Sequence, residues 1–399
     1  MKQKQELLNV AILSCARTAI GRAHKGALAN ERPDDMAAFV MQAALQRANI
    51  QPQDMEDVVL GCAMPEAEQG MNVARIAACR AGLPYHVPAC SVNRFCASGL
   101  QAVAQVAQAI ETGQINIGLA GGVESMSAVP MGGHLFRANP YLIKEQPTIY
   151  MPMGLTAERV AKKCDISRAD QDTFALHSHE KAVKAQQQGW FDDEIAPLPL
   201  PLGGWQSGKQ TADQNERMFT HDECPRSDTS LQALQKLKPA FAQDGSVTAG
   251  NSSPLNDGAA VVALMQGNQA KQENRSIMGW FRAFVTVGLE PEIMGLGPVE
   301  AVKKLLALTG LSLQDIGVIE LNEAFAAQAV ACIRKLEMDP NKINPCGGAI
   351  ALGHPLGCTG ARQVGTMLHY MKKQQIALGI CTMCVGGGMG AAALIELAQ

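Results

Sequence analysis

A cysteine stands where a predicted strand gives way to a helix, in the stretch Val92–Leu100 (VNRFCASGL). The first N–H groups of a helix are free, and the positive end of its dipole favours a thiolate. Cys96 is therefore a candidate nucleophile. Most cysteines in proteins are small buried hydrophobic residues, so this stretch alone leaves a structural role open.

A histidine lies in the glycine-rich stretch Asn344–Gly360 (NPCGGAIALGHPLGCTG). Its five glycines are expected to let the backbone fold tightly around another group. His354 precedes Pro355, a residue suited to the first turn of a helix. A single histidine is more often structural, but a cysteine and histidine pair is a common way to activate a sulfur nucleophile.

Two further segments lie on predicted apolar strands, and the second ends its strand with polar side chains. In Cys381–Gly388 (CTMCVGGG) the Cys-x-x-Cys spacing raises a redox or zinc alternative, although no second pair of this kind is present. Residues three apart on a strand face opposite sides, so Cys384, beside the glycines, is the better site candidate. In Leu321–Phe325 (LNEAF), Asn322 either caps the next helix or belongs to a site.

Strands alternate with helical patterns along the chain, which predicts an α/β fold with a largely parallel, doubly covered sheet. The sites are then expected where the carboxyl ends of strands meet helix N-termini. The clearest strands are Val10–Cys15, Val58–Cys62 and Ile115–Ala120, and the clearest helices are Asp34–Arg47, Cys96–Thr112 and Ser167–Gln188.

The order of elements repeats, which indicates duplication. Ala48–Gly61 and Thr309–Asn322 share length and pattern at an offset of 261 residues, and Ile376–Cys384 echoes the strand Ile115–Ala120. We therefore expect an N-terminal half of residues 1–124 plus 247–275 and a C-terminal half of residues 276–399. An inserted loop domain, residues 125–246, would separate them and includes the polar stretch Gly203–Glu216.

Composition narrows the class of protein. Among 399 residues, 34 Lys and Arg stand against 37 Asp and Glu, a balance that argues against a nucleic-acid binder. The uncharged segment Ile376–Ile395 could span a bilayer, but its glycine run favours two buried strands joined by a turn. The unpatterned cysteines indicate a reduced, cytoplasmic protein, and most are expected among apolar residues: Cys15, Cys62, Cys79, Cys90, Cys332 and Cys381.

Together these motifs resemble the thiolases, the acyl-CoA:acetyl-CoA acyltransferase family. The resemblance covers essentially the whole chain, in the family's order, and rests on NRFCASGL, NEAF, NPCGGAIALGHPLGCTG and CVGGGMG, with MGLTAE, KLKPAF and TAGNSSPLNDGAA between them. It implies a five-layered αβαβα fold of two duplicated halves. It also implies a chain that is not monomeric, a homodimer or homotetramer that dimerises through its N-terminal half.

The resemblance implies roles for the candidate residues. Cys96 would carry the acyl group, His354 would take its proton, and Cys384 would act as the second acid and base. Asn322 would hold a water in one oxyanion hole, and the N–H groups of Cys96 and Gly386 would form the other. The residues expected to bind substrate or CoA are Arg226, Phe241, Ala249, Ser253, Met153 and Phe325.

Two positions resemble the degradative 3-ketoacyl-CoA thiolases more than the short-chain enzymes. Short-chain members typically have His-Met-Gly where this chain has Pro152–Gly154, and Gln-Leu-Cys-Gly where it has Arg94–Ala97. The expected reaction is cleavage of a 3-ketoacyl-CoA by CoA, in β-oxidation, with CoA as substrate and no metal or other cofactor. A partner subunit of a β-oxidation complex is also possible in such a protein.

Three alternatives stay open at this point. The chain could be an acetoacetyl-CoA thiolase, or a related condensing enzyme, although condensing enzymes usually lack the late Cys-x-Gly. It could also be a catalytically silent member of the fold that binds CoA or lipid. A silent member would be expected to have lost Cys96, His354 or Cys384, and all three are present.

Overall fold

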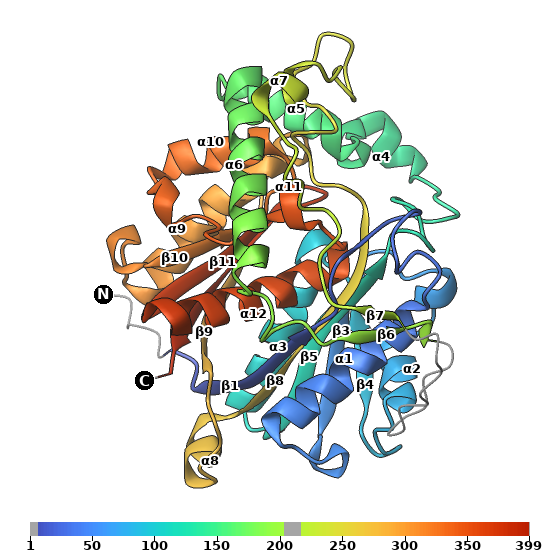
Figure 1. The fold of residues 1–399 in the computed structure, drawn as a ribbon, viewed down its shortest axis with the longest axis vertical. Coiled ribbons are helices and arrows are strands. Elements are labelled where there is room, and N and C mark those ends of the chain that lie inside the picture. Colours follow the sequence, from blue (N-terminus) through green and yellow to red (C-terminus); the bar gives the residue numbers. More distant parts are fainter. Residues whose placement is uncertain (1–6, 203–216, 399) are drawn as a thin grey trace.

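The computed structural model describes residues 7–202 and 217–398, so the stretch Gly203–Glu216 lies outside the described residues. Its centre is one mixed sheet in the order β10-β11-β12-β9-β1-β8-β5-β3-β4 (Figure 1). The strands of the N-terminal part are β1 (Val10–Arg17), β3 (Asp57–Gly61), β4 (Ala89–Val92), β5 (Ile117–Ser125) and β8 (Asn256–Gln266), with the short β2 (Gly21–Arg22) paired to β8. Those of the C-terminal part are β9 (Gly279–Gly288), β10 (Val318–Leu321), β11 (Leu378–Val385) and β12 (Met389–Leu397).

The sheet contains the same four-strand pattern twice, which confirms the duplication. From β3 through β5 and β8 to β1, the pairings are parallel, antiparallel and antiparallel, and the series β10, β11, β12, β9 repeats them. The two series meet where β1 pairs antiparallel with β9. Strands β3 and β10 begin at Asp57 and Val318, which keeps the offset of 261 residues.

The prediction of a largely parallel sheet is wrong. Only β3 with β4, β3 with β5, and β10 with β11 pair in parallel among the strands named above. Helices cover both faces of this sheet, so its antiparallel strands are buried on both faces and form the continuous apolar runs typical of parallel strands. The hydrophobic pattern therefore could not separate the two kinds of pairing.

Three apolar clusters divide the molecule into five layers. Helices α1 (Pro33–Ala48) and α2 (Val73–Arg80) pack on the outer face of the N-terminal strands. Helices α3 (Ser98–Glu111) and α12 (Leu356–Gln374) fill the space between the two groups of strands, and α9 (Gly297–Thr309) and α10 (Ala326–Leu336) cover the outer C-terminal face. Neighbouring residues alternate between layers, as Val261 and Val262 do.

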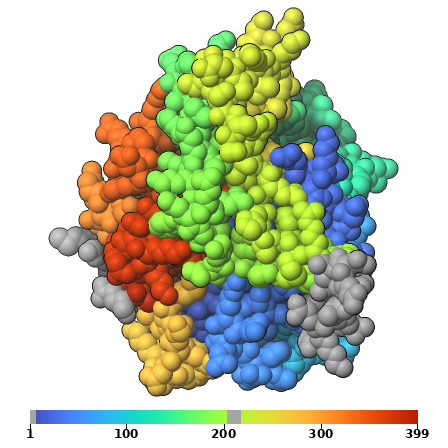
Figure 2. Space-filling model, in the orientation of Figure 1, coloured from blue at the N-terminus to red at the C-terminus, as the bar shows by residue number. Residues whose placement is uncertain are grey.

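The segment between β5 and β8 lies over both halves. It contains α4 (Pro140–Glu145), α5 (Met153–Lys163), α6 (Arg168–Gln187), α7 (Leu231–Gln235) and the paired strands β6 (Leu198–Leu200) and β7 (Arg217–Phe219). Ser167 and Asp170 form a capping box that starts α6 at its predicted position. Figure 2 shows this segment, green to yellow, covering the upper front of the molecule. The division into residues 1–124 plus 247–275, 125–246 and 276–399 stays a prediction.

The remaining short elements connect these layers. They are α8 (Gly267–Gln272), α11 (Ala349–Leu352), and the six-residue 3₁₀ segment η6 (Pro291–Leu296), which is kinked at Ile293. The others are single 3₁₀ turns, η1 (Pro52–Asp54), η2 (Ala67–Gln69), η3 (Phe95–Ala97), η4 (Pro147–Tyr150), η7 (Leu313–Asp315) and η8 (Pro340–Lys342). Within the described ranges, none of the helices combines the length and apolar character needed to cross a bilayer. The segment Ile376–Ile395 forms two buried strands, as expected.

Glycines bring the starts of α3 and α12 into contact. A Cβ on Gly99 would lie 2.5 Å from the carbonyl oxygen of Gly357, and one on Gly360 would collide with the backbone of Leu100. The glycines that the sequence marks around His354 thus serve, in part, to let one helix approach the other. Because Cys96 and His354 each lie two residues before one of these helices, the contact brings the two candidates to the same region.

The prediction about cysteines needs one correction. Cys79 and Cys90 are exposed, whereas Cys15, Cys62, Cys332 and Cys381 are buried as expected. Both exposed residues lie at the edge of the molecule, on α2 and on β4, the last strand of the described sheet. Their apolar neighbours in sequence therefore did not predict burial.

Candidate active site

A strained turn presents Cys96. Phe95 has φ 43°, a left-handed value that aromatic residues rarely adopt, and such a residue typically costs ~1–3 kcal/mol. Neighbouring side chains hold the turn, because the N–H of Phe95 donates to Asn93 Oδ1 (2.8 Å) and Ser98 Oγ donates to the Phe95 carbonyl (2.7 Å). Helix α3 consequently begins at Ser98, two residues later than predicted.

The thiol of Cys96 is enclosed, with 7% of the residue exposed. Burial raises its pKa to about 11, the backbone N–H groups of Gly386 and of Cys96 itself lower it, and the charge of Glu124 raises it. The sulfur is therefore protonated at neutral pH and needs a base to become a nucleophile. The contact with the Gly386 N–H places two backbone donors beside the thiol, the arrangement expected for an oxyanion hole.

His354 is held as a neutral base. Burial lowers its pKa to about 3, with a smaller contribution from Arg362. Thr359 Oγ1 donates its only proton to the Pro355 carbonyl (2.9 Å), so in the 2.6 Å contact it must accept from His354 Nδ1–H. The lone pair of His354 then lies on Nε2, the atom that can accept a proton. The His354 backbone N–H donates to Asn256 Oδ1 (2.9 Å).

Asn322 lies directly against the histidine. Its Nδ2 is 3.2 Å from His354 Nε2, and the lone pair assigned above makes Nδ2 the donor. Its own N–H donates to the Thr382 carbonyl (2.9 Å), which fixes the end of β10 to β11. The buried Oδ1 of Asn322 has no hydrogen-bond partner in the described part of the chain, so it is available to a water or substrate group.

Cys384 lies near the end of β11 and is completely buried. Burial raises its pKa well above the ordinary value, and the nearby sulfur of Cys96 raises it further. Cys381 belongs to the central apolar cluster and Cys384 to the outer C-terminal one, so the two sulfurs face opposite sides as predicted. Cys384 is therefore a protonated thiol within electrostatic range of Cys96.

The candidates thus form two linked groups. In the first group, the N–H of Gly386 and the thiol of Cys384 lie near the sulfur of Cys96. In the second group, His354 and Asn322 share a hydrogen bond. The hydrogen bonds found in residues 7–202 and 217–398 do not include a direct one between Cys96 and His354. The contact of α3 with α12 keeps the two groups in one region.

Apolar side chains surround the Gly386–Gly387 backbone. A Cβ on Gly386 would lie 3.4 Å from Met153 Sδ and 3.7 Å from the Phe95 ring. One on Gly387 would lie 3.9 Å from Ile149 Cδ1 and 4.0 Å from Met389 Cε. Met153, a predicted site residue, therefore borders the same backbone as Cys96, and Ile149 and Met389 are neighbours that the sequence did not indicate.

The other predicted binding residues lie on loops beside this centre. The rings of Phe241 and Phe325 meet edge to face with centroids 6.0 Å apart, and Phe241 packs against the start of α5 at Gly154. Ser253 donates through N–H (3.0 Å) and Oγ (3.1 Å) to the Ala324 carbonyl, two residues after Asn322. The roles of these residues in binding stay predictions.

Two predicted binding residues are exposed. Ala249 lies on the surface of the loop before β8. The Arg226 side chain is 61% exposed, and its backbone N–H donates to His179 Nδ1 (3.2 Å). Burial lowers the pKa of His179 to about 4, so this histidine is a neutral acceptor at pH 7. The role of Arg226 in binding stays a prediction.

This chain is similar to known proteins along nearly its whole length. The family model described as thiolase, N-terminal domain, matches residues 10–268, and that described as thiolase, C-terminal domain, matches residues 275–397. This chain belongs to the thiolase family. A protein named 3-ketoacyl-CoA thiolase from Bacillus subtilis (strain 168) is 50% identical over 387 residues, which cover 97% of this chain and 98% of the relative.

Other relatives and solved structures agree. Human peroxisomal 3-ketoacyl-CoA thiolase is 43% identical and covers 97% of this thiolase, with 91% of the relative covered. The dimeric peroxisomal thiolase of Saccharomyces cerevisiae superimposes with a TM-score of 0.88 at 41% identity, covering 100% of this chain and 99% of that one. A Bacillus anthracis acetyl-CoA acetyltransferase also gives 0.88, at 38% identity, covering 98% and 100%. The thiolase fold expected from the resemblance is confirmed.

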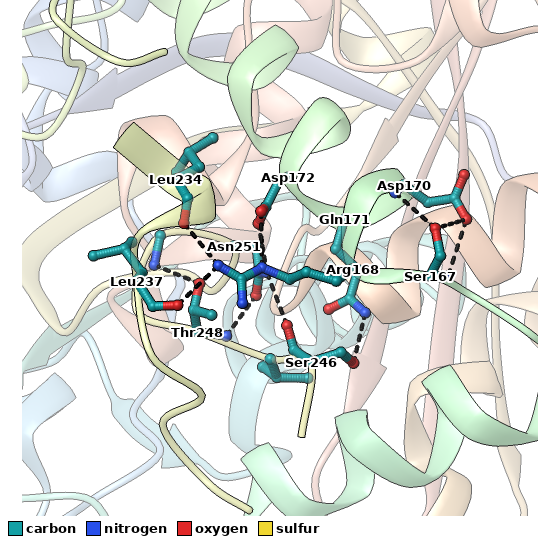
Figure 3. A network of polar contacts seen from close by, with 12 residues as sticks. Ser167, Arg168, Asp170, Gln171, Asp172, Leu234, Leu237, Ser246, Thr248 and Asn251 are labelled. Atoms are coloured by element: carbon teal, nitrogen blue, oxygen red, sulfur yellow. Dashed lines mark hydrogen bonds and ion pairs between the residues drawn. The ribbon is translucent and has the colours of Figure 1, made fainter. Parts of the chain in front are cut away.

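A buried polar network fixes the loop that carries Ala249 and Ser253 (Figure 3). Asp172 on α6 pairs with Arg168 (2.8 Å) and accepts from Asn251 Nδ2 (3.0 Å). Asn251 Oδ1 accepts from the Thr248 N–H (2.8 Å), and its Nδ2 also lies 3.2 Å from the Ser246 carbonyl. The Asn251 carbonyl accepts from the Ala326 N–H (2.9 Å), which ties the loop to the start of α10.

We expect Asn251→Ala to raise the KM for CoA by about 5- to 20-fold while kcat changes less than about threefold. The substitution removes the three hydrogen bonds made by one side chain, each worth ~1 kcal/mol. It loosens a loop that carries Ala249 and Ser253 but none of the candidate catalytic residues. Steady-state kinetics with CoA as the varied substrate measures this. Asn268→Ala, on the distant helix α8, is the matched control. A fall in kcat with KM unchanged would contradict the assignment of this loop to CoA.

Sequence reasoning missed several residues that support the centre. Thr359 selects the tautomer of His354, Asn93 and Ser98 hold the strained turn, and Asn256 fixes the His354 backbone. Thr359 lies five residues after His354, outside the three- and four-residue spacing of helical neighbours, so the spacing gave no signal of their contact. The contact with Asn256 spans 98 residues and leaves no local signal.

Proposed function

We propose that this thiolase cleaves 3-ketoacyl-CoA with CoA, giving acetyl-CoA and an acyl-CoA shortened by two carbons, through an acyl-Cys96 intermediate and a ping-pong sequence. The observation that carries the proposal is the grouping of two thiols and a neutral histidine with paired backbone donors. Relatives of this chain over nearly its full length are named 3-ketoacyl-CoA thiolases. The pathway in which such an enzyme acts is fatty-acid β-oxidation.

In the first half-reaction, His354 Nε2 takes the proton of Cys96, and the thiolate attacks the C3 carbonyl carbon. The N–H groups of Cys96 and Gly386 would stabilise the oxyanion, each such donor being worth ~3–4 kcal/mol in comparable sites. The C2–C3 bond breaks, and its electron pair becomes an enolate of acetyl-CoA. Protonated His354 and a water held by Asn322 would donate to the enolate oxygen, while Cys384 gives its proton to C2.

In the second half-reaction, the thiol of free CoA attacks the acyl-Cys96 carbonyl. Cys384, now a thiolate, takes the proton of CoA, and Cys96 leaves as the thiolate and recovers the proton held by His354. The same two backbone donors would hold the acyl oxygen. All protons are restored at the end of the cycle, so the chemistry needs no redox or metal partner.

Longer substrates are expected to react better than acetoacetyl-CoA. The acyl chain would contact apolar residues around Gly386 and Gly387, and each buried methylene contributes ~0.8 kcal/mol. We expect kcat/KM for 3-ketooctanoyl-CoA to exceed that for acetoacetyl-CoA by about 10- to 100-fold, measured by loss of the ketoacyl thioester. Activity confined to acetoacetyl-CoA would instead place the chain with the acetyl-CoA acetyltransferases. Binding of CoA without activity would favour a silent binding protein.

We also propose that the chain forms a homodimer through its N-terminal half. Strand β4 is the last strand of the described sheet, and Met71 (96% exposed) and Tyr85 (87% exposed) lie near it. Exposed apolar residues at an unpaired strand edge are typical of a pairing surface. The Saccharomyces cerevisiae structure is titled dimeric. Light scattering of the purified protein should give twice the chain mass, and a monomer or tetramer would contradict the proposal.

Three further parts of the proposal concern its setting. We propose that no cofactor is needed besides CoA as substrate, so dialysis against EDTA should leave kcat unchanged.

We propose a cytoplasmic location, although several relatives are named peroxisomal, and fractionation of the source cells tests it. A partner subunit of a β-oxidation complex is a proposal that co-purification tests.

A further inference from the structure

A buried carboxylate links the two halves of this thiolase beside the active site. Glu124 lies on β5 and is completely buried. Its Oε2 accepts from the N–H groups of Ala63 (2.8 Å) and Gly357 (2.8 Å), and its Oε1 accepts from the N–H of Met64 (3.0 Å) and from Gln69 Nε2 (3.1 Å). A single oxygen of Glu124 thus joins the loop after β3 to the first turn of α12, which lies 233 residues from Glu124 along the chain.

Three of these partners, Ala63, Met64 and Gly357, lie beside residues of the proposed mechanism. Ala63 and Met64 share a small apolar cluster with Cys96 and Leu356. The Ala63 carbonyl accepts from Asn93 Nδ2 (3.0 Å), and Asn93 in turn holds the strained turn before Cys96. On the other side, Gly357 lies three residues after His354, in the helix whose start fixes that histidine.

We propose that Glu124 is a positioning residue, which sets the placement of Cys96 relative to His354 through the loop after β3 and the first turn of α12. Neither the sequence motifs nor the family resemblance assigned it a role. The inference rests on the proposed function only for the identity of the nucleophile.

The surroundings of Glu124 favour its ionised form despite burial. Burial raises its pKa, but four N–H donors oppose that effect, and a carboxylate is the acceptor-only form that matches them. Gly357 also lies at a helix N-terminus, where a negative charge is favourable. The titratable groups that interact with this charge are Cys62 after β3, Cys96 on η3 and Cys358 on α12, and Cys384 faces Cys96 from β11.

The variant Glu124→Gln separates positioning from charge. Both carboxylate oxygens accept two N–H groups, so either orientation of the amide turns an NH₂ toward two donors. We expect kcat for thiolysis of 3-ketooctanoyl-CoA to fall by about 10- to 100-fold, the range seen when a reacting group is misplaced, with KM for CoA within about twofold. We expect the pH midpoint for alkylation of Cys96 by iodoacetamide to fall by about 0.5 or more, since a negative charge beside the thiol is removed.

Alkylation needs no substrate, so it tests the inference even if the proposed reaction is wrong. Mass spectrometry of the Cys96 peptide distinguishes its alkylation from that of the exposed Cys79 and Cys90. Glu111→Gln, at the exposed end of α3, is the control for loss of one carboxylate. Glu124→Asp keeps the charge and should restore the wild-type midpoint while kcat stays lowered. This second variant also serves if the first does not fold.

Two results would overturn the inference. One is a Glu124→Gln protein with wild-type kcat and an unchanged alkylation midpoint. The other is a lowered kcat with an unchanged midpoint in Glu124→Gln, accompanied by a lower melting temperature, which would make Glu124 a stabilising residue only.

Discussion

Cys96→Ser is expected to lower kcat for thiolysis of 3-ketooctanoyl-CoA by at least about 10³-fold, the largest effect of any substitution considered. The hydroxyl keeps the size of the thiol and its contacts with the two backbone N–H groups, but it is a far weaker nucleophile. An alcohol also gives up its proton far less readily than a thiol, so the same His354 activates it much less. Steady-state assays of the purified variant, with circular dichroism to check folding, measure the loss.

The matched control is Cys164→Ser, at the end of α5, which changes the same atom in a half-buried cysteine outside the candidate site. Its kcat should stay within about twofold of the wild type. Retention of more than a tenth of the activity by Cys96→Ser would show that another residue carries the acyl group.

Cys384→Ala is expected to separate the two half-reactions. Without this thiol, no acid protonates C2 when the C2–C3 bond breaks, so kcat for thiolysis should fall by about 10²- to 10⁴-fold, the range of general acid catalysis. Exchange of an acyl group between hexanoyl-CoA and a second small thiol needs no carbon acid. It uses Cys384 only to move a proton to or from a thiol, a step that solvent can take over. That exchange should retain a much larger share of its rate, about a tenth or more.

Cys332→Ala is the control for the cavity that the substitution leaves. Cys332 is also completely buried and lies in the same apolar cluster as Cys384. Both variants should lose similar unfolding free energy, on the order of 1–2 kcal/mol, and only Cys384→Ala should lose thiolysis. Equal loss of thiolysis and of exchange in Cys384→Ala would contradict an acid role specific to C2.

The sequence predicted the layers better than the strand directions. Helical and strand periodicity placed α1 and α6 within one or two residues, and the repeated pattern around residues 48–61 and 309–322 predicted the duplicated halves. The strand directions were predicted wrongly because β8 and β12 are buried on both faces, which removes the alternation of apolar and polar residues typical of antiparallel strands. The start of α3 was misplaced because the left-handed backbone of Phe95 has no signal in an aromatic residue.

The candidate site, like the fold, was predicted from the sequence only in part. Cys96, His354, Asn322 and Cys384 stand in stretches whose glycines and polar ends made them visible in the sequence. Asn256, which fixes the backbone of His354, could not be found in that way, because its hydrogen bond joins residues 98 positions apart in the chain. Glu124 lies four residues beyond the predicted strand Ile115–Ala120, and only the fold brings it to Ala63 and Gly357.

The most direct test of the account is to trap the acyl-enzyme. The protein would be mixed with 3-ketooctanoyl-CoA in the absence of free CoA, quenched in acid, digested, and examined by mass spectrometry. The account predicts one equivalent of acetyl-CoA released and a hexanoyl group on the peptide that contains Cys96. A hexanoyl group on another residue, or release of acetyl-CoA with Cys96 unmodified, would contradict it.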